Sequence, residues 1–476
     1  MKLTTKCRRV LCFVLALIML IPTLSASAVN FKPIESIDEK GKPVELKLYS
    51  KACCVMDIES GEDIFETNAD KEMPIATLNM LMTSLLVVEK YPDVHALKGS
   101  FASAGSEAYD ELFDKGTPTA DIQPNEKVTY YDLICAMMLQ SSCEAANIAA
   151  INIGGSISGF TKMMNDKAAA LGLSHTKFSS AHGFWTSGNY STANDLAKLS
   201  RHIIENSSIL KDIVCLSEYN MSKTEYHPDG TTLYNNNVML NSASPYYYPA
   251  VKGLKTGTTN EAGRCFSSYS VIEGTGYIIV TLGAPLEKLA QDEKKAEADP
   301  NSLYANDYIY YSLIDHINLC NWCKNYLDTS DFLNPESEIR DVTVMFGDKD
   351  YANLRAKTGY SRMWPTYIKT SDVKRVITVK ENIVAPVEVG DILGEMKLVY
   401  DGETIATLDL VSTTQVKRST FSSKVEIAKS YFRSKVFFIT LGIIVAVIAL
   451  YTALHVVMVH KHYLRKNVED QDDNRF

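Results

Sequence analysis

The sequence lacks any strong compositional bias. Its 476 residues include 24 glycines and 15 prolines, and 46% of them are hydrophobic. These proportions exclude a collagen-like, low-complexity or disordered chain and indicate a folded protein. An excess of positive charge is also missing, because 48 Lys and Arg face 57 Asp and Glu, giving a net charge of −9. This balance argues against a general nucleic-acid binder, and the length favours at least two globular units.

A dense disulfide framework and a metal-binding motif are absent too. Ten cysteines are present, but two lie in an N-terminal targeting segment and the other eight show no regular spacing. Cys320 and Cys323 have C-x-x-C spacing without a second Cys or His pair nearby, and no H-E-x-x-H motif occurs. Cys53 and Cys54 are adjacent in a strand-like run, so we expect at most one of them to face the core. We therefore expect buried thiols, no metal site and no cofactor.

An apolar run near the N-terminus predicts export. Basic residues precede the run at 10–21, and residues 26–28 read Ala-Ser-Ala, the small-x-small form of a cleavage site. Residues 1–28 are therefore predicted to be a secretory signal peptide.

A second apolar run predicts a membrane anchor. Residues 436–459 contain no Asp, Glu, Lys or Arg and exceed the roughly 20 residues that cross a hydrocarbon core. With an export signal before it, this run predicts a single-pass protein of the cell membrane. Residues 29–435 would be extracellular, and the tail 460–476 would be cytoplasmic.

Four segments are expected between the two apolar runs. A polar leader at 29–50 precedes an α+β domain at 51–330, in which strands flank a set of helices. Short strands separated by Gly, Asp and Asn turns predict a small all-β domain at 331–415. Residues 416–435 then form a juxtamembrane spacer. In the α+β domain we expect a solvated loop at 287–301. We also expect helical stretches near 77–90, 131–153, 159–171 and 192–206.

The most informative motif is Lys255-Thr256-Gly257. On an expected edge strand, it offers a cation, a hydroxyl and exposed backbone amides to a substrate that bears a carboxylate. Glycine lets a ligand backbone lie close to the strand. Residues 260–263 read Asn-Glu-Ala-Gly and follow directly, which strengthens a short motif.

The chain resembles the low-molecular-mass penicillin-binding proteins, specifically the D-alanyl-D-alanine carboxypeptidase family of serine peptidases. The resemblance spans roughly residues 50–410. It implies a penicillin-binding-protein and serine β-lactamase-like transpeptidase domain followed by a small all-β domain. It also implies a bacterial cell-wall ligand, the peptidoglycan stem peptide that ends in D-Ala-D-Ala. Besides the Lys-Thr-Gly motif, the stretches that carry it are 56–61, 172–178, 182–183, 190–196, 346–351 and 385–386.

The family's first motif is degenerate here. Members carry S-x-x-K, S-x-N and K-T-G, in which the first serine attacks the D-Ala-D-Ala carbonyl and the lysine one turn later is its base. Residues 76–80 read Ala-Thr-Leu-Asn-Met, so Thr77 takes the serine position and Met80 the lysine position. Methionine accepts no proton, and a hydroxyl without an adjacent base is a poor nucleophile.

The second motif is half retained. Ser141 matches its serine, and Cys143 replaces the asparagine that would hydrogen-bond the substrate backbone. A thiol is a weak donor and cannot make both amide contacts. Cys143 as a new nucleophile is a minor alternative to a semi-buried thiol that fills the space of the asparagine.

The third motif matches the family fully. By resemblance, Lys255 belongs to the catalytic set and provides the cation for the substrate carboxylate. The backbone amides of Thr77 and Thr258 would form the oxyanion hole. The substrate-binding residues implied are Thr256, Gly257, Thr258 and Thr259.

Two functions remain open from the sequence. The first is a non-catalytic homologue that binds stem peptides or another cell-wall protein. The second is an active carboxypeptidase in which Thr77 is activated through Ser141 and Lys255. The loss of two catalytic side chains and one motif asparagine favours the first. His182, in a family-like His-Gly turn, is expected to have a structural role.

Overall fold

The computed structural model describes residues 30–472 except 185–186, 300–301 and 306–307. The predicted signal peptide at 1–28 lies outside the described residues. The chain divides into two compact units. Of the described residues, the first unit comprises those up to Ser330 together with Ser361–Lys374 and Val399–Ile405. The second comprises Asp331–Tyr360, Arg375–Leu398 and those from Ala406 onwards.

A five-stranded antiparallel sheet organises the first unit, with strand order β4-β3-β11-β10-β9. The central strand β11 is rich in β-branched and aromatic residues, and its last eight residues are buried. The strand that carries the Lys-Thr-Gly motif, β9, lies at one edge, as the sequence predicts. The strands are β3 (Ala52–Asp57), β4 (Asp63–Thr67), β9 (Val251–Thr259), β10 (Gly263–Ile272) and β11 (Thr275–Ala284).

Helices cover both faces of this sheet. On β10, Ser267 hydrogen-bonds Ser200 of α7 at 2.7 Å, whereas the next residue, Ser268, hydrogen-bonds His316 of α10 at 2.9 Å. Successive strand residues point to opposite faces, so α7 and α10 lie on opposite sides of the sheet. The helices of this unit are α2 (Met80–Lys90), α3 (Val94–Gly99), α4 (Tyr130–Gln140), α5 (Cys143–Gly154), α6 (Ile157–Ala170), α7 (Ala193–Asn206), α8 (Ser208–Val214), α9 (Ala290–Ala298) and α10 (Tyr311–Tyr326).

The double coverage corrects one prediction about cysteine. Cys53 and Cys54 point to opposite faces of β3, yet both are 0% exposed, because each face is covered. The prediction of buried thiols is confirmed for seven of the eight described cysteines, and only Cys215 is exposed.

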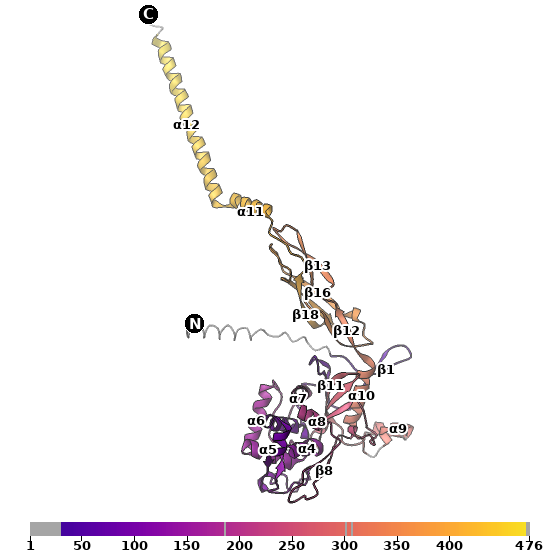
Figure 1. Cartoon of the computed structure of the whole chain (residues 1–476). Coiled ribbons are helices and arrows are strands. Elements are labelled where there is room, and N and C mark those ends of the chain that lie inside the picture. The colour runs from indigo at the N-terminus through magenta and orange to yellow at the C-terminus, as the bar shows by residue number, and fades with distance from the viewer. Residues whose placement is uncertain (1–29, 185–186, 300–301, 306–307, 473–476) are drawn as a thin grey trace. The chain divides into compact units, whose positions relative to one another are not determined.

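Helix α2 forms the centre of the helical part. It packs against α4, α5, α7 and α8, and its residues are buried from Met80 to Val88. Figure 1 shows α4, α5 and α6 gathered beside the sheet. The unit also contains short pairings and 3₁₀ turns, namely β1 (Ile34–Ile37), β2 (Pro43–Glu45), β5 (Phe101–Ala102), β6 (Val128–Thr129), β7 (Glu218–Asn220), β8 (Thr232–Tyr234), η1 (Ala76–Asn79), η2 (Ser106–Ala108), η3 (Val238–Leu240) and η4 (Leu303–Ala305).

Two polar segments contain regular structure, and for one of them this differs from the prediction. The leader contains the β1–β2 hairpin and buries Phe31 and Leu46. The stretch 287–301, predicted as a solvated loop, contains helix α9. Its Asp292 is 0% exposed and accepts hydrogen bonds from the hydroxyls of Tyr49 and Tyr311.

The C-terminal part is β-rich and then helical. A second five-stranded sheet has the order β13-β14-β18-β17-β16. Beyond it, Lys435–His462 within α12 has a mean hydropathy of 2.6 and is long and apolar enough to cross a membrane. The elements are β12 (Leu327–Leu333), β13 (Glu338–Thr343), β14 (Tyr351–Ala356), β15 (Tyr360–Pro365), η5 (Thr370–Asp372), β16 (Lys374–Val379), β17 (Ile392–Tyr400), β18 (Glu403–Ser412), α11 (Thr420–Arg433) and α12 (Lys435–Asp472).

Candidate active site

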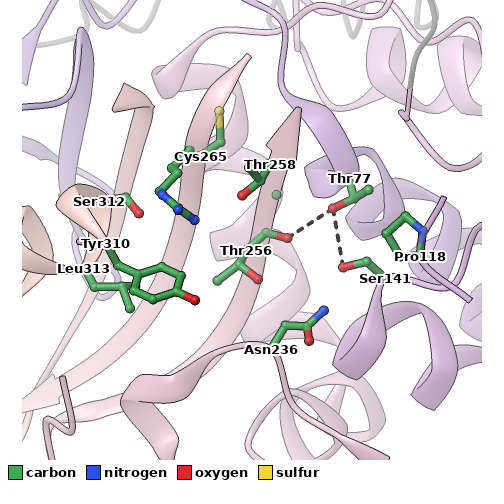
Figure 2. Close-up of a pocket in the computed structure, with 12 residues that line it drawn as sticks. Thr77, Pro118, Ser141, Asn236, Thr256, Thr258, Cys265, Tyr310, Ser312 and Leu313 are labelled. Carbon is green, nitrogen blue, oxygen red and sulfur yellow. Dashed lines mark hydrogen bonds between the residues drawn. The ribbon is translucent and has the colours of Figure 1, made fainter. Parts of the chain in front are cut away.

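Thr77 lies where the chain enters helix α2. It belongs to η1, which leads directly into α2, and its side chain is buried. The Thr77 hydroxyl donates to the backbone carbonyl of Thr256 on β9, at 3.2 Å, and lies 3.5 Å from Ser141 Oγ. Figure 2 shows both contacts. The hydroxyl proton therefore points to a carbonyl and to another hydroxyl, and neither is a base of useful strength.

Met80 occupies the position one helical turn after Thr77. It is the first residue of α2, is 0% exposed and belongs to the hydrophobic core. A thioether is only a weak hydrogen-bond acceptor and takes up no proton near neutral pH. The helix that carries Thr77 thus provides no base at this position.

Ser141 is presented by a break between two helices. It has a left-handed backbone with φ of 62° and ends α4, and Ser142 then caps α5 by accepting a hydrogen bond from Ala145 N at 3.1 Å. The helical stretch predicted at 131–153 is therefore two helices. The break directs the Ser141 hydroxyl towards Thr77.

Lys255 is enclosed behind Ser141. Its side chain is 1% exposed, and its ammonium donates to Ser141 Oγ at 2.5 Å and to the carbonyl of Thr256 at 2.7 Å. Burial lowers the pKa of Lys255 to about 7. The amine therefore faces Ser141 rather than the open part of the site, unlike the carboxylate-facing cation that the sequence led us to expect.

A pocket of about 230 Å³ lies in front of these groups. Of the residues predicted from the sequence, its lining includes Thr77, Ser141, Thr256, Gly257 and Thr258. A Cβ at Gly257 would lie 3.0 Å from the backbone nitrogen of Thr77, so the absence of a side chain lets β9 approach η1 closely. The pocket wall on this side is therefore mostly backbone and threonine hydroxyls.

Comparison with known protein families identifies the family of this chain. Residues 39–286 match the family described as D-alanyl-D-alanine carboxypeptidase, and residues 328–418 match the C-terminal domain of penicillin-binding protein 5. The chain belongs to the D-alanyl-D-alanine carboxypeptidase family. It is 26% identical to the D-alanyl-D-alanine carboxypeptidase DacF of Bacillus subtilis over 395 residues, which cover 82% of this chain and 92% of that protein. It is 25% identical to DacC of Escherichia coli over 379 residues, covering 79% and 86%.

Solved structures show the fold of these penicillin-binding proteins. Penicillin-binding protein 5 of Haemophilus influenzae superimposes with a TM-score of 0.55 at 23% identity, covering 79% of this chain and 99% of that one. The carboxypeptidase DacD of Francisella tularensis gives 0.58 at 20% identity, covering 84% and 100%. The fold is therefore a transpeptidase-type α+β domain followed by a C-terminal all-β domain, as predicted.

Cys143 replaces the family asparagine without taking over its function. It is 0% exposed, and among the described residues its thiol donates to the backbone carbonyl of Ser141 alone, at 3.7 Å. Burial raises the pKa of the Cys143 thiol, with a smaller contribution from the neighbouring Glu144. A protonated, enclosed thiol is neither a nucleophile nor a ligand donor.

His182 has a structural role, as the sequence predicts. Its Nδ1 accepts a hydrogen bond from Phe184 N at 3.0 Å, so the ring proton sits on Nε2 and is donated to Glu111 Oε1, also at 3.0 Å. This hydrogen bond is the main reason why the pKa of Glu111 is lowered. Among the residues that the structure describes, no cluster of three or more Cys, His, Asp or Glu side chains is arranged to hold a metal ion.

Sequence reasoning missed part of the pocket. Arg264 and Tyr310 line it, whereas Thr259 faces a neighbouring pocket and accepts a hydrogen bond from Ala262 N at 3.1 Å. The position of Arg264 could have been found, because the turn at 260–263 places it opposite Thr258 in a hairpin. Tyr310 comes from the start of α10, about 50 residues further along, and no local pattern links it to this site.

Proposed function

We propose that this protein is a membrane-anchored cell-surface receptor for peptidoglycan stem peptides that binds the D-Ala-D-Ala terminus without cleaving it. The observation that carries the proposal is the burial of Met80 at the position of the general base. Members of this family act on peptides of this kind, which supports the choice of ligand.

The arrangement around Thr77 supports the loss of catalysis. General-base assistance is typically worth about 10²–10⁴ in rate, and Met80 cannot provide it. The Thr77 methyl group adds bulk beside the hydroxyl and restricts χ1. In addition, the Thr77 hydroxyl is already occupied with the Thr256 carbonyl at 3.2 Å.

The opposite wall of the pocket supports retained binding. The family's third motif is complete, and Gly257 keeps the close approach between β9 and η1 that a ligand strand and an oxyanion hole require. The amides of Thr77 and Thr258 depend on backbone shape and not on the two altered catalytic side chains. A cleft of this kind holds a peptide terminus while lacking the base that would cleave it.

A second function has one observation in its favour. With a pKa of about 7 and an amine 2.5 Å from Ser141 Oγ, Lys255 is partly neutral near pH 7 and is placed to draw a proton from Ser141. Ser141 would then draw a proton from Thr77 across 3.5 Å. This relay is the route for an active carboxypeptidase, and its long second step makes it the weaker candidate.

The anchor belongs to the same proposal. Helix α12 contains the candidate span Lys435–His462, and relatives of this chain are named D-alanyl-D-alanine carboxypeptidases. We place the peptide-binding unit outside the cell and the C-terminal tail inside.

Two measurements on the full chain in detergent test the proposal. Affinity for an N-acylated Lys-D-Ala-D-Ala tripeptide is measured by calorimetry, and acylation by a fluorescent penicillin is followed on a gel and mapped by mass spectrometry. Binding without acylation is the expected result. Stoichiometric acylation of Thr77 would reject the non-catalytic role and favour the second function, and a wild type that neither binds nor is acylated would reject both.

A further inference from the structure

Arg264 is a cation in the pocket that the family motifs do not include. It lies at the start of β10 directly opposite Thr258 of β9, so the two side chains share one face of the hairpin. Both residues line the pocket together with Tyr310. Figure 2 shows Thr258 and Tyr310 facing this space from the strand and from the start of α10.

The guanidinium of Arg264 is held in place by an aromatic stack. Its Cζ lies 4.4 Å from the centre of the Tyr310 ring, a cation–π distance. Tyr310 is in turn fixed by Tyr246, whose ring meets it edge-on at 5.4 Å and whose hydroxyl accepts a hydrogen bond from Tyr310 N at 3.1 Å. The position of the charge is therefore set before any ligand arrives.

Arg264 also lacks an anion. Its Nε is buried and has no hydrogen-bond partner among the described residues, and none of the ion pairs between described residues includes Arg264. A buried donor on a charged group costs free energy unless something accepts from it. Arg264 also lines the pocket, and its terminal nitrogens form no hydrogen bond with a described residue, so they are the donors that an anion in the pocket would meet.

Lys255 cannot fill this role, because its amine is enclosed and is used on Ser141 and on the Thr256 carbonyl. A guanidinium matches a carboxylate better than an ammonium does, since its planar fork donates two parallel hydrogen bonds. We infer that Arg264, oriented by Tyr310, binds the terminal carboxylate of the peptide ligand and restricts the pocket to peptides with a free C-terminus. The inference rests on the proposed function and names the group that selects the ligand.

The experiment compares a tripeptide ending in D-Ala-D-Ala carboxylate with the same peptide as its C-terminal amide, using the full chain in detergent. The wild type is expected to bind the carboxylate about 10- to 100-fold more tightly than the amide, the range for a charged hydrogen bond. In Arg264→Gln this preference is expected to vanish while the affinity for the amide stays unchanged. Arg264→Lys should restore part of the preference.

Lys252→Gln is the matched control. Lys252 is an exposed cation on the same strand as Thr258 and does not line the pocket, so its loss should leave both affinities unchanged. Should Arg264→Gln fail to fold, Tyr310→Leu removes the stack and should lower the affinity for the carboxylate only.

The outcomes separate the two claims. A wild type that binds both peptides equally overturns the inference and leaves the proposed function standing. Arg264→Gln with its preference intact has the same meaning. A wild type that binds neither peptide rejects the proposed function and the inference with it.

Discussion

Restoring the two family side chains at Thr77 and Met80 is the sharpest test of the chemistry. Thr77→Ser removes the methyl group, and Met80→Lys places an amine one helical turn away. Among the described residues, the hydrogen-bonded route from Thr77 to an amine runs through Ser141, with steps of 3.5 Å and 2.5 Å. The first step exceeds the usual O–H···O separation of about 2.5–3.0 Å, so assistance through it is weak. A direct base should raise the rate of penicillin acylation by about 10²–10⁴.

The new lysine has a cost that the same structure determines. Met80 is 0% exposed, so an amine in its place is buried among core side chains. Burial has already lowered the pKa of Lys255 to about 7, and another buried amine should likewise be neutral at mildly alkaline pH. We expect a loss of stability on the order of 1–3 kcal/mol. The acylation assay should therefore be run at pH 8.5 and well below the unfolding temperature.

Fluorescent penicillin labelling with time gives the rate for each variant. Thr77→Ser alone and Met80→Lys alone should stay near the wild-type rate, because nucleophile and base act as a unit. The double variant Thr77→Ser/Met80→Gln is the matched control, since glutamine is similar in length and accepts no proton. Rapid stoichiometric labelling of the wild type at Thr77, or equal rates for the Lys and Gln double variants, would refute the reasoning.

Three further predictions follow from other parts of the molecule. The folded-state pKa of Lys255 lies below its ordinary value of 10.5, so the wild type should gain stability relative to Lys255→Met as pH rises from about 7 to 10. Urea unfolding at pH 6.5 and 9 measures the difference in unfolding free energy between the two proteins, and a difference that does not change with pH contradicts the prediction. Gly183→Ala should destabilise by about 1–3 kcal/mol more than Gly172→Ala, because both glycines have positive φ but only at Gly183 would a Cβ meet backbone, 2.2 Å from Ala76 O; thermal unfolding compares the two, and equal shifts reject the close contact. Protease added to wall-stripped cells should digest the part that precedes Lys435–His462, and complete protection would reverse the orientation.

The α+β and all-β segments were predictable from local sequence patterns, and the transpeptidase-type fold from the resemblance of short motifs to a known family. Residues 255–259 predicted an edge strand, and β9 is one. The all-β segment and the membrane-length helix also follow from local patterns of turns and apolar runs. These features depend on neighbours in sequence, which is what periodicity reports.

The features that the sequence did not predict depend on contacts between segments that are distant in the sequence. Helix α9 looked like a solvated loop because its sequence is highly charged, but the hydroxyls of Tyr49 and Tyr311 converge on Asp292 and hold the helix in place. Both thiols of β3 are buried because helices cover the two faces, which a single strand cannot reveal. In the site, Tyr310 reaches the pocket from another element, so the orientation of Arg264 could not be anticipated.

The burial of Met80 has an evolutionary consequence. An apolar side chain at this closed position avoids the cost of burying an amine, whereas the reverse change places an amine in a closed core. A single return to lysine would lower stability at once and give no activity while residue 77 remains threonine. Replacing lysine by methionine at position 80 is therefore easier than the reverse substitution. Under the proposed function, selection acts on how often and how long the cleft holds its ligand, which are the properties of a sensor.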